Sequence, residues 1–364
     1  MQGFILEIKM QKKRLLIISN TYPSKEKPYA GIFVKNHINE LNRRGKYVVT
    51  SFVMHRKFTS PLGSIIKYTK AALRFIPLLF QSFDLIHLHF FYPLIWIVFI
   101  YKLFRPETPV MVTFHGSDLH SRFKGRFSNL LHRYALRKIN FVHCVGKDLA
   151  DEFFDVFGYK ASLIIPMGID RKIFNTKNKI NLARKKFDFI FVGSFLEGKG
   201  INLLVTAISI LSKKIRYCFI GSGKEEYLIR KCAKTHQITI HNNYSQNDIA
   251  PILHQSKFLI LPSKYETFGL VVSEALYCGV PCIVSNIGGL RGQVKDSVNG
   301  LLIRSLDLKE ITLVMQRALS MSGLEYSNMC QNAENSNYSY SLEKVIDQME
   351  GAYDRLIANL QSEQ

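Results

Sequence analysis

The sequence predicts an α/β protein made of two doubly wound parallel-sheet domains that face each other across a cleft. Strand-length apolar runs alternate with longer helical patterns along almost the whole chain. These runs are nearly continuous in Val, Ile, Leu and Phe, which is typical of parallel strands covered by helices on both faces. The 364 residues also exceed one ordinary domain and suit two.

The first domain is expected over residues 1–182. Helix candidates there include Gly31–Arg44 and Ser128–Lys138, and the order of elements predicts a Rossmann-like sheet with right-handed crossovers. The predicted strands are Leu15–Ser19, Tyr47–Val53, Leu85–Leu88, Val110–Thr113, Phe141–Val145 and Leu163–Ile165.

A polar stretch rich in Lys and Asn, Lys172–Lys186, predicts a linker to a second domain over residues 183–340. A final segment, Ser341–Leu360, has a helical pattern and no strand after it. Residues 341–364 are therefore expected to form a C-terminal helix that could pack back on the first domain. The strands predicted in the second domain are Phe187–Val192, Arg216–Ile220, Ile238–His241, Phe258–Leu261, Pro281–Val284 and Gly300–Ile303.

Composition indicates a cytoplasmic protein. The six cysteines form no CxxC pair and are interpreted as reduced core thiols. The first residues contain an acid within a short apolar run and no small-residue cleavage site, so they do not resemble a signal peptide. The most apolar stretch, Pro93–Phe104, is too short to span a bilayer and predicts a buried or interfacial helix.

The richest loop chemistry follows the predicted strand that ends at Leu261. A helix is expected to start near Thr267, with Glu266 at its mouth and the free amides of Phe268, Gly269 and Leu270 facing an anion such as phosphate. Glu274 comes eight residues after Glu266, about two turns along the same face. Its carboxylate could accept hydrogen bonds from a ribose diol.

Glu266 could instead be an acid favoured by the helix dipole, and Glu274 a solvated surface residue. Glu274 lies between Val272 and Ala275 in an otherwise apolar helix, however, which favours a functional role. Cys278 and Cys282 on the next turn are interpreted as core thiols.

The segment S-x-x-E-x-F-G-L-V-V-x-E-A-L-x-x-G-V-P, with Glu266 and Glu274, closely resembles the retaining glycosyltransferases of family 4, which have the GT-B fold. In that family the second Glu holds the nucleotide ribose and the first contacts the donor sugar. The resemblance implies that Thr267, Phe268, Gly269 and Leu270 contact the donor, through their backbone amides at the diphosphate.

The resemblance covers nearly the whole chain. In FVGSFLEGKG, Gly193 and Ser194 belong to the family's donor loop, and Lys199 matches a lysine that binds the diphosphate. The family often has Arg where this chain has Ser194. In the first domain, Gly31 matches a glycine loop that approaches the phosphates, and His115 of TFHGSD matches a histidine near the transferred sugar. The chain departs from the family pattern again at Met167 and Gly292.

The resemblance implies a metal-independent, retaining hexosyltransferase-like enzyme with His115, Glu266 and Lys199 as catalytic residues. It would transfer sugar from a nucleotide-sugar donor to a glycan or lipid-linked acceptor in bacterial cell-surface polysaccharide synthesis. No cofactor or metal is expected, since the sequence has neither an Asp-x-Asp motif nor a His/Cys cluster with ligand spacing. His87 and His89, which alternate on a predicted strand, are interpreted as structural.

Two other functions stay open. A sugar-nucleotide 2-epimerase shares the two-domain architecture, and so basic a chain could bind nucleic acid or membrane without catalysis. The Glu266/Glu274 helix with Lys199 argues against the epimerase. Nucleic acid is not expected as a partner, because no aromatic-interleaved basic stripe or binding motif is present.

The charge distribution predicts peripheral binding to the inner face of the cell membrane. Residues 1–182 contain 29 of the 49 basic and 11 of the 28 acidic residues, a formal charge of +18 against +3 for the rest. Segment Ser64–Phe80 sets bases among apolar residues as an interfacial helix does, and Arg122–Lys138 is a second acid-free basic run. An anionic leaflet would attract both, although a solvated helix face is the alternative.

Overall fold

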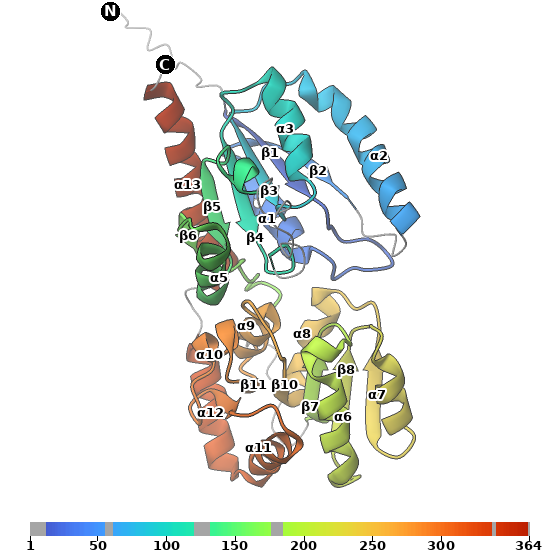
Figure 1. Ribbon diagram of the computed structural model, residues 1–364. Coiled ribbons are helices and arrows are strands. Elements are labelled where there is room, and N and C mark those ends of the chain that lie inside the picture. The colour runs from blue at the N-terminus through green and yellow to red at the C-terminus, as the bar shows by residue number, and fades with distance from the viewer. Residues whose placement is uncertain (1–11, 55–60, 120–131, 176–184, 337–339, 363–364) are drawn as a thin grey trace, which may run out of the picture.

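The computed structural model describes residues 12–54, 61–119, 132–175, 185–336 and 340–362. The chain forms two α/β halves stacked one on the other, each around a six-stranded sheet (Figure 1). All strand pairs of both sheets are parallel. The predicted fold class is therefore confirmed.

The N-terminal sheet has the order β2-β1-β3-β4-β5-β6. Side chains on both faces of β3 and β4 are buried, as the continuous apolar runs predicted. The strand order reverses between β1 and β3, which opens a crevice beyond their carboxyl ends. The strands are β1 (Arg14–Ser19), β2 (Val48–Val53), β3 (Leu85–His89), β4 (Val110–Phe114), β5 (Phe141–Cys144) and β6 (Leu163–Ile164).

Helices cover both faces of this sheet (Figure 1). Helix α1 follows Gly31 and stops at Gly45, which have φ angles of 67° and 65°, a left-handed conformation that glycine adopts without strain. The helices are α1 (Ile32–Arg44), α2 (Pro61–Leu79), α3 (Ile95–Phe104) and α5 (Lys147–Phe157).

The C-terminal sheet has the order β12-β11-β10-β7-β8-β9, and its order reverses between β7 and β10. Its strands are β7 (Phe187–Val192), β8 (Arg216–Ile220), β9 (Gln237–His241), β10 (Ser256–Leu261), β11 (Cys282–Ser285) and β12 (Gly300–Ile303). Its helices are α6 (Ile201–Ile210), α7 (Glu226–Cys232), α8 (Gln246–His254), α9 (Leu270–Tyr277), α10 (Gly288–Gln293), α11 (Leu308–Ser320) and α12 (Gly323–Asn335), with a 3₁₀ turn at Glu197–Lys199.

The last helix, α13 (Leu342–Ser362), returns to the N-terminal half. The chain crosses back to the N-terminal half beside Ile169. The amide of Ile169 donates to the carbonyl oxygen of Tyr340, and the amide of Leu342 donates to the carbonyl oxygen of Ile169. The apolar side of α13 then joins a core formed with α1 and the first strands. Its buried members there include Leu342, Ile346, Met349, Tyr353, Leu356 and Ile357.

One expected helix boundary needs correction, and three expected segments are only partly described. The helix expected near Thr267 starts three residues later, at Leu270, because Gly269 before it has φ 79° and ψ 65°. Parts of the expected helix Ser128–Lys138, the basic run Arg122–Lys138 and the linker Lys172–Lys186 lie outside the described residues. Within the described residues, no helix combines the length and apolar character that crossing a membrane requires.

Candidate active site

The predicted site residues gather at the carboxyl ends of strands from both sheets. In the C-terminal domain they lie on the loops after β7 and β10, the two strands between which the strand order reverses, and on helix α9 that follows β10. In the N-terminal domain they lie on the loops after β1 and β4. These two sets of loops face each other because the halves stack with their strand ends together (Figure 1).

Two salt bridges join the loops after β7 and β10. Lys199 pairs with Glu266, and Lys264 contacts Glu197 at 2.7 Å. Gly200 allows the loops to approach, since a Cβ at this position would lie 2.0 Å from the carbonyl oxygen of Pro262. The cation predicted for the diphosphate and the acid predicted for the sugar are therefore direct neighbours.

Glu266 lies in the loop before α9, so it does not share a helix face with Glu274 as the spacing had suggested. The first turn of α9 has no side-chain cap; its amides begin at Gly269 and Leu270, and Phe268 lies before the helix. Phe268 is buried, and its carbonyl oxygen accepts a hydrogen bond from Gln293 of α10. The amides thus sit on a backbone that a neighbouring helix holds in place.

Glu274 is buried on α9, with 7% of its surface exposed, which excludes the solvated position. Nε2 of Gln246 donates to its Oε1 at 2.8 Å. Burial raises the pKa of Glu274 to about 7, although this hydrogen bond lowers it. A buried carboxylate with so few donors around it is suited to accept hydroxyl groups from a ligand.

His115 lies in the loop after β4. Oδ1 of Asp118 accepts from the amides of His115 and Gly116, both at 3.0 Å, and fixes this turn. The His115 ring lies 4.6 Å from the Phe33 ring and 4.4 Å from the Phe90 ring. Burial, with smaller effects of His143 and His37, holds the pKa of His115 well below its usual value. The imidazole is therefore neutral at pH 7.

The loop before α9 touches the N-terminal domain directly. Oγ1 of Thr267 donates to the carbonyl oxygen of His115 at 3.4 Å. Glycines make this approach possible: a Cβ at Gly116 would lie 2.3 Å from Cγ2 of Thr267, and one at Gly146 would lie 2.5 Å from its carbonyl oxygen. Consequently Glu266 and Thr267 lie close to His115, across the boundary between the domains.

The remaining predicted residues lie along the same boundary. Gly31 is buried directly before α1, and Gly193 and Ser194 follow β7. The two domains approach each other near these residues at Tyr29 and Ser222, whose hydroxyl groups lie 2.8 Å apart. Ser194, where relatives often have Arg, is exposed and holds no charge.

At Gly292, where many family members have an acid, no atom of the described residues lies within 4 Å of the position that a Cβ would take. It lines an interdomain cavity of about 440 Å³ beside Phe268, bounded by Gly146, Gly288 and residues of α13. The missing acid therefore leaves space open at this position.

A histidine network behind His115 was missed by sequence reasoning. It starts at the carbonyl oxygen of Ile165, which can only accept, so Nε2 of His143 donates to it at 2.7 Å. Nδ1 of neutral His143 then accepts from Oγ1 of Thr113 at 2.9 Å. Thr113 in turn accepts from Nε2 of His87 at 2.7 Å. This order fixes which nitrogen of each ring has the proton.

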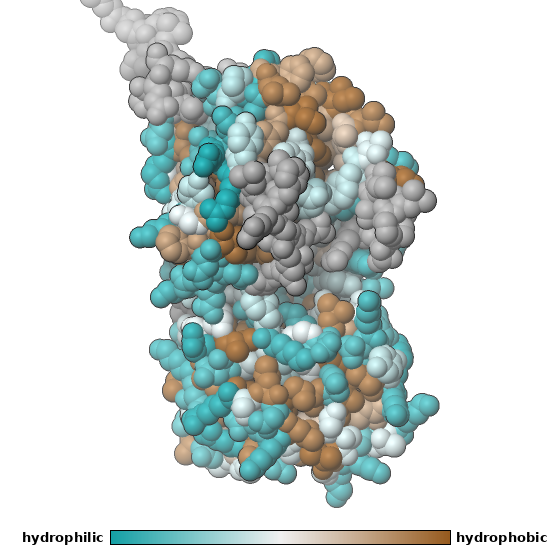
Figure 2. Space-filling model, in the orientation of Figure 1, coloured by the Kyte–Doolittle hydropathy of each residue, from teal (hydrophilic) through white to brown (hydrophobic). Residues whose placement is uncertain are grey.

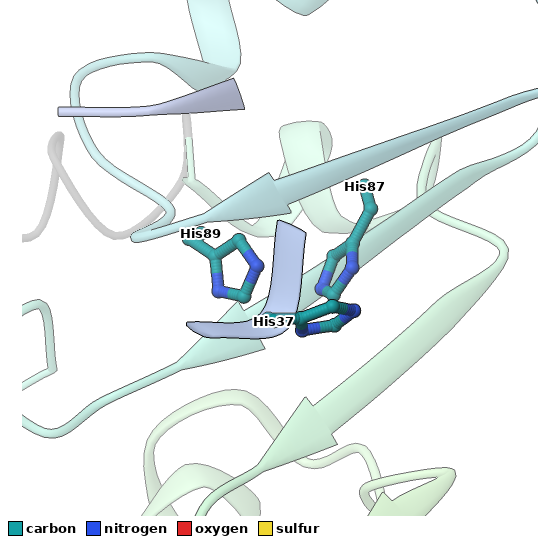
Figure 3. A group of neighbouring side chains, drawn as sticks. All are labelled: His37, His87 and His89. Carbon is teal, nitrogen blue, oxygen red and sulfur yellow. The ribbon is translucent and has the colours of Figure 1, made fainter. Parts of the chain in front are cut away.

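The network continues from His87 to Tyr353 on α13, and Figure 3 shows His37, His87 and His89 close together. Nδ1 of His87 accepts from the hydroxyl of Tyr353 at 2.6 Å, and that oxygen accepts from Nε2 of His37 at 2.9 Å. His89 packs on both other rings, with centroids 4.2 Å from His87 and 5.4 Å from His37. Its Nδ1 lies 3.2 Å from Nε2 of His115. The histidines interpreted as structural thus support a predicted catalytic residue.

His37, His87 and His89 are also the group of described residues with ring nitrogens close enough for a shared metal, within 4.8 Å. The network engages both nitrogens of His87 and one each of His37 and His89. Nδ1 of His37 and Nε2 of His89 have no hydrogen-bond partner among the described residues. Two nitrogens are fewer than the three protein ligands typical of catalytic zinc, so the group is better suited to hydrogen bonding.

Comparison with known proteins agrees with this geometry. Residues 25–172 match the family described as Glycosyltransferase Family 4, and residues 172–336 match Glycosyl transferases group 1. An uncharacterized glycosyltransferase of Methanocaldococcus jannaschii is 27% identical over 76% of each chain. A Bacillus subtilis glycosyltransferase assigned to teichuronic acid biosynthesis is 24% identical over 76% of this chain and 82% of its own.

Two solved structures have the same fold. Sucrose-phosphate synthase from Thermosynechococcus elongatus superposes with a TM-score of 0.75 at 19% identity, covering 96% of this chain and 100% of that chain. Anabaena HepE in complex with UDP and glucose superposes with a TM-score of 0.70 at 15% identity, covering 94% and 100%. Because the two family matches together extend from residue 25 to residue 336, the chain belongs to glycosyltransferase family 4.

Proposed function

We propose that this glycosyltransferase transfers a sugar from a nucleotide-sugar donor, held mainly by the C-terminal domain, to a glycan or lipid-linked acceptor on the N-terminal side. The observation that carries the proposal is the meeting of Lys199, Glu266 and Thr267 with His115 across the domain boundary. Anabaena HepE has been solved with UDP and glucose, which supports a nucleotide-sugar donor for a chain of the same fold.

The proposed chemistry assigns charge stabilisation to Lys199 and to the amides before α9. Breaking the anomeric bond leaves negative charge on the diphosphate, which a fixed cation and fixed amide dipoles would stabilise. These groups take the place of a metal in the proposal. Glu266 and neutral His115 would orient the sugar, and Glu274 would accept hydrogen bonds from the ribose. Retention at the anomeric carbon is proposed from the family resemblance.

The proposed acceptor is lipid-linked, because the N-terminal domain has an exposed apolar surface. Leu73, Ile76 and Phe80 lie on one side of α2 and its C-terminal end, with exposed fractions of 62%, 46% and 71%. Leu103 and Phe104 at the end of α3 are 81% and 49% exposed. We name these five residues the apolar edge; Figure 2 shows it as part of the brown area over α2 and α3.

This edge changes the expected mode of membrane attachment. Of the three bases in the segment Ser64–Phe80, Lys67 donates to the carbonyl oxygen of Asn20 at 3.0 Å and the Arg74 guanidinium lies 5.7 Å from the centre of the Phe52 ring. Both are therefore engaged with the protein. Apolar insertion, supported by exposed bases such as Lys70, explains attachment to a cytoplasmic leaflet better than charge alone. The Bacillus subtilis relative supports a role in cell-surface polysaccharide synthesis.

A nucleotide screen tests the donor assignment. We expect one of UDP, GDP and ADP to raise the Tm of the wild type, and Glu274→Ala to remove that shift. The matching nucleotide sugar should remain intact without acceptor. Conversion of its sugar to an epimer would instead assign the chain to 2-epimerases, and no stabilisation by any of the three would contradict the proposal.

Vesicle sedimentation tests the membrane assignment. Wild type should bind phosphatidylglycerol vesicles at low salt and keep part of that binding at high salt, because salt screens the supporting bases but not apolar insertion. Neutral vesicles should bind it less than anionic ones. Leu103→Asp should release it, whereas Leu324→Asp on α12, where the side chain is 72% exposed, should not. Equal sedimentation of both variants would show that the apolar edge does not bind lipid.

A further inference from the structure

Two amide side chains connect the carboxylate of Glu274 to the opposite domain. Nε2 of Gln246, the first residue of α8, donates to Oε1 of Glu274 at 2.8 Å. Nδ2 of Asn36 donates to Oε1 of Gln246 at 3.0 Å. Gln246 and Glu274 belong to the C-terminal domain, whereas Asn36 lies on α1 of the N-terminal domain. We call these three side chains the amide relay.

The carboxylate dictates the direction of the relay. An ionised carboxylate only accepts, so the NH₂ group of Gln246 has to face Glu274 and its oxygen has to face away. That oxygen in turn needs a donor, which is the NH₂ group of Asn36. The orientation of Gln246 is thus determined from both ends, by one residue of each domain.

The relay reaches a group that has little other support. Glu274 is buried, and Gln246 is the hydrogen-bond partner that the described part of the structure gives to its carboxylate. A buried carboxylate held at one oxygen by one flexible amide depends on that amide for its direction. Asn36 removes the flexibility, because it fixes the amide from the other side of the cleft.

We propose that Gln246 is a positioning residue, which directs Glu274 toward the donor ribose only while α1 of the opposite domain is in place. The inference rests on the ribose role of Glu274 in the proposed function. Helix α1 also begins directly after Gly31, so one helix presents the glycine loop and steadies the ribose carboxylate. Alignment of the two domains then strengthens nucleotide binding, and by thermodynamic linkage nucleotide binding stabilises the aligned domains by the same free energy.

Titration calorimetry of the full chain with UDP tests the relay, or with GDP or ADP if that nucleotide stabilises the wild type most. Gln246→Ala should weaken binding by about tenfold, the effect of losing one hydrogen bond to a charged group, and Asn36→Ala by about fivefold, because the bond it removes joins two neutral amides. The double variant should bind no more weakly than Gln246→Ala, because both changes break the same chain. Gln246→Glu keeps the length but has no NH₂ donor, and should bind more weakly than Gln246→Ala.

Ser222→Ala is the matched control. It removes the Tyr29–Ser222 hydrogen bond between the same two domains and leaves the relay intact, so its UDP affinity should stay within about twofold of wild type. Wild-type affinity of Asn36→Ala, or additive losses in the double variant, would overturn the relay. The Glu274→Ala variant distinguishes the ribose assignment from the relay. Unchanged UDP binding by this variant would remove the ribose assignment itself. Weakened UDP binding by this variant, together with wild-type binding by the Asn36 and Gln246 variants, would remove the relay alone.

Discussion

Replacing Glu274 by glutamine should stabilise the fold while it weakens nucleotide binding. The side chain is buried and 7% exposed, and burial raises its pKa from 4.5 to about 7. Ionising it inside the folded protein therefore costs about 3 kcal/mol, at about 1.4 kcal/mol for each pKa unit. Glutamine has nearly the same shape, keeps an oxygen for Gln246 to donate to, and never ionises.

The pH dependence of this gain has a definite sign. Below about pH 4.5 the carboxyl is protonated in both states and the burial of charge costs nothing. Between pH 4.5 and 7 the unfolded chain loses the proton first, so wild type loses stability relative to Glu274→Gln. The stability deficit of wild type relative to Glu274→Gln is about 1 kcal/mol near pH 5.5 and stays constant at about 3 kcal/mol above pH 7.

Denaturant unfolding at pH 5.5 and 8.5 measures this difference, with UDP calorimetry in parallel. Wild-type affinity should rise from pH 6 to 8, since ribose hydroxyls donate to the ionised form, while the Gln variant should bind weakly throughout. Glu40→Gln is a control of opposite sign, because its hydrogen bond with Arg43 lowers the pKa of that buried acid. A stability gap for Glu274→Gln that does not grow with pH would refute the reasoning.

Three further outcomes are expected. Lys199→Ala should lower turnover far more than Tm, and EDTA should leave wild-type turnover unchanged; full activity of the variant, or loss with EDTA, would contradict the assigned charge stabilisation. Tyr353→Phe leaves two buried ring nitrogens without partners and should cost about 2 kcal/mol or more and reduce turnover. Tyr326→Phe, which loses the bond to the backbone oxygen of Lys257 far from the site, should affect stability alone. Gly146→Ala should weaken the contact with Thr267 and lower turnover without loss of either core, as checked by activity and circular dichroism.

The sequence was sufficient to predict the strands and their parallel arrangement, because the strands are apolar runs that alternate with helices. The second domain illustrates this, since Phe187–Val192, Arg216–Ile220 and Gly300–Ile303 are strands with the predicted bounds. The error at α9 has a local cause. Thr267 and Phe268 can form helix, but Gly269 adopts a left-handed conformation that ends the loop there, and no periodicity reports a φ angle.

The contacts that arrange the candidate site were beyond sequence reasoning because they are long-range. Asn36 and Gln246 are 210 residues apart, and Tyr353 and His37 are 316 apart. An asparagine on a helix and a glutamine at a helix start carry no local signal. Only the stacking of two sheets and the return of α13 bring such residues together.

The buried histidines explain why the C-terminal helix and the predicted sugar site belong to one physical unit. Burial lowers the pKa of His37 to about 3 and that of His143 to about 4, so these rings are neutral and each offers one donor and one acceptor. A chain of neutral rings has one consistent direction, which the carbonyl oxygen of Ile165 sets at one end. Tyr353, like Thr113, both donates and accepts between two rings. Because Tyr353 lies on α13, the C-terminal helix of the protein contributes to the support of His115.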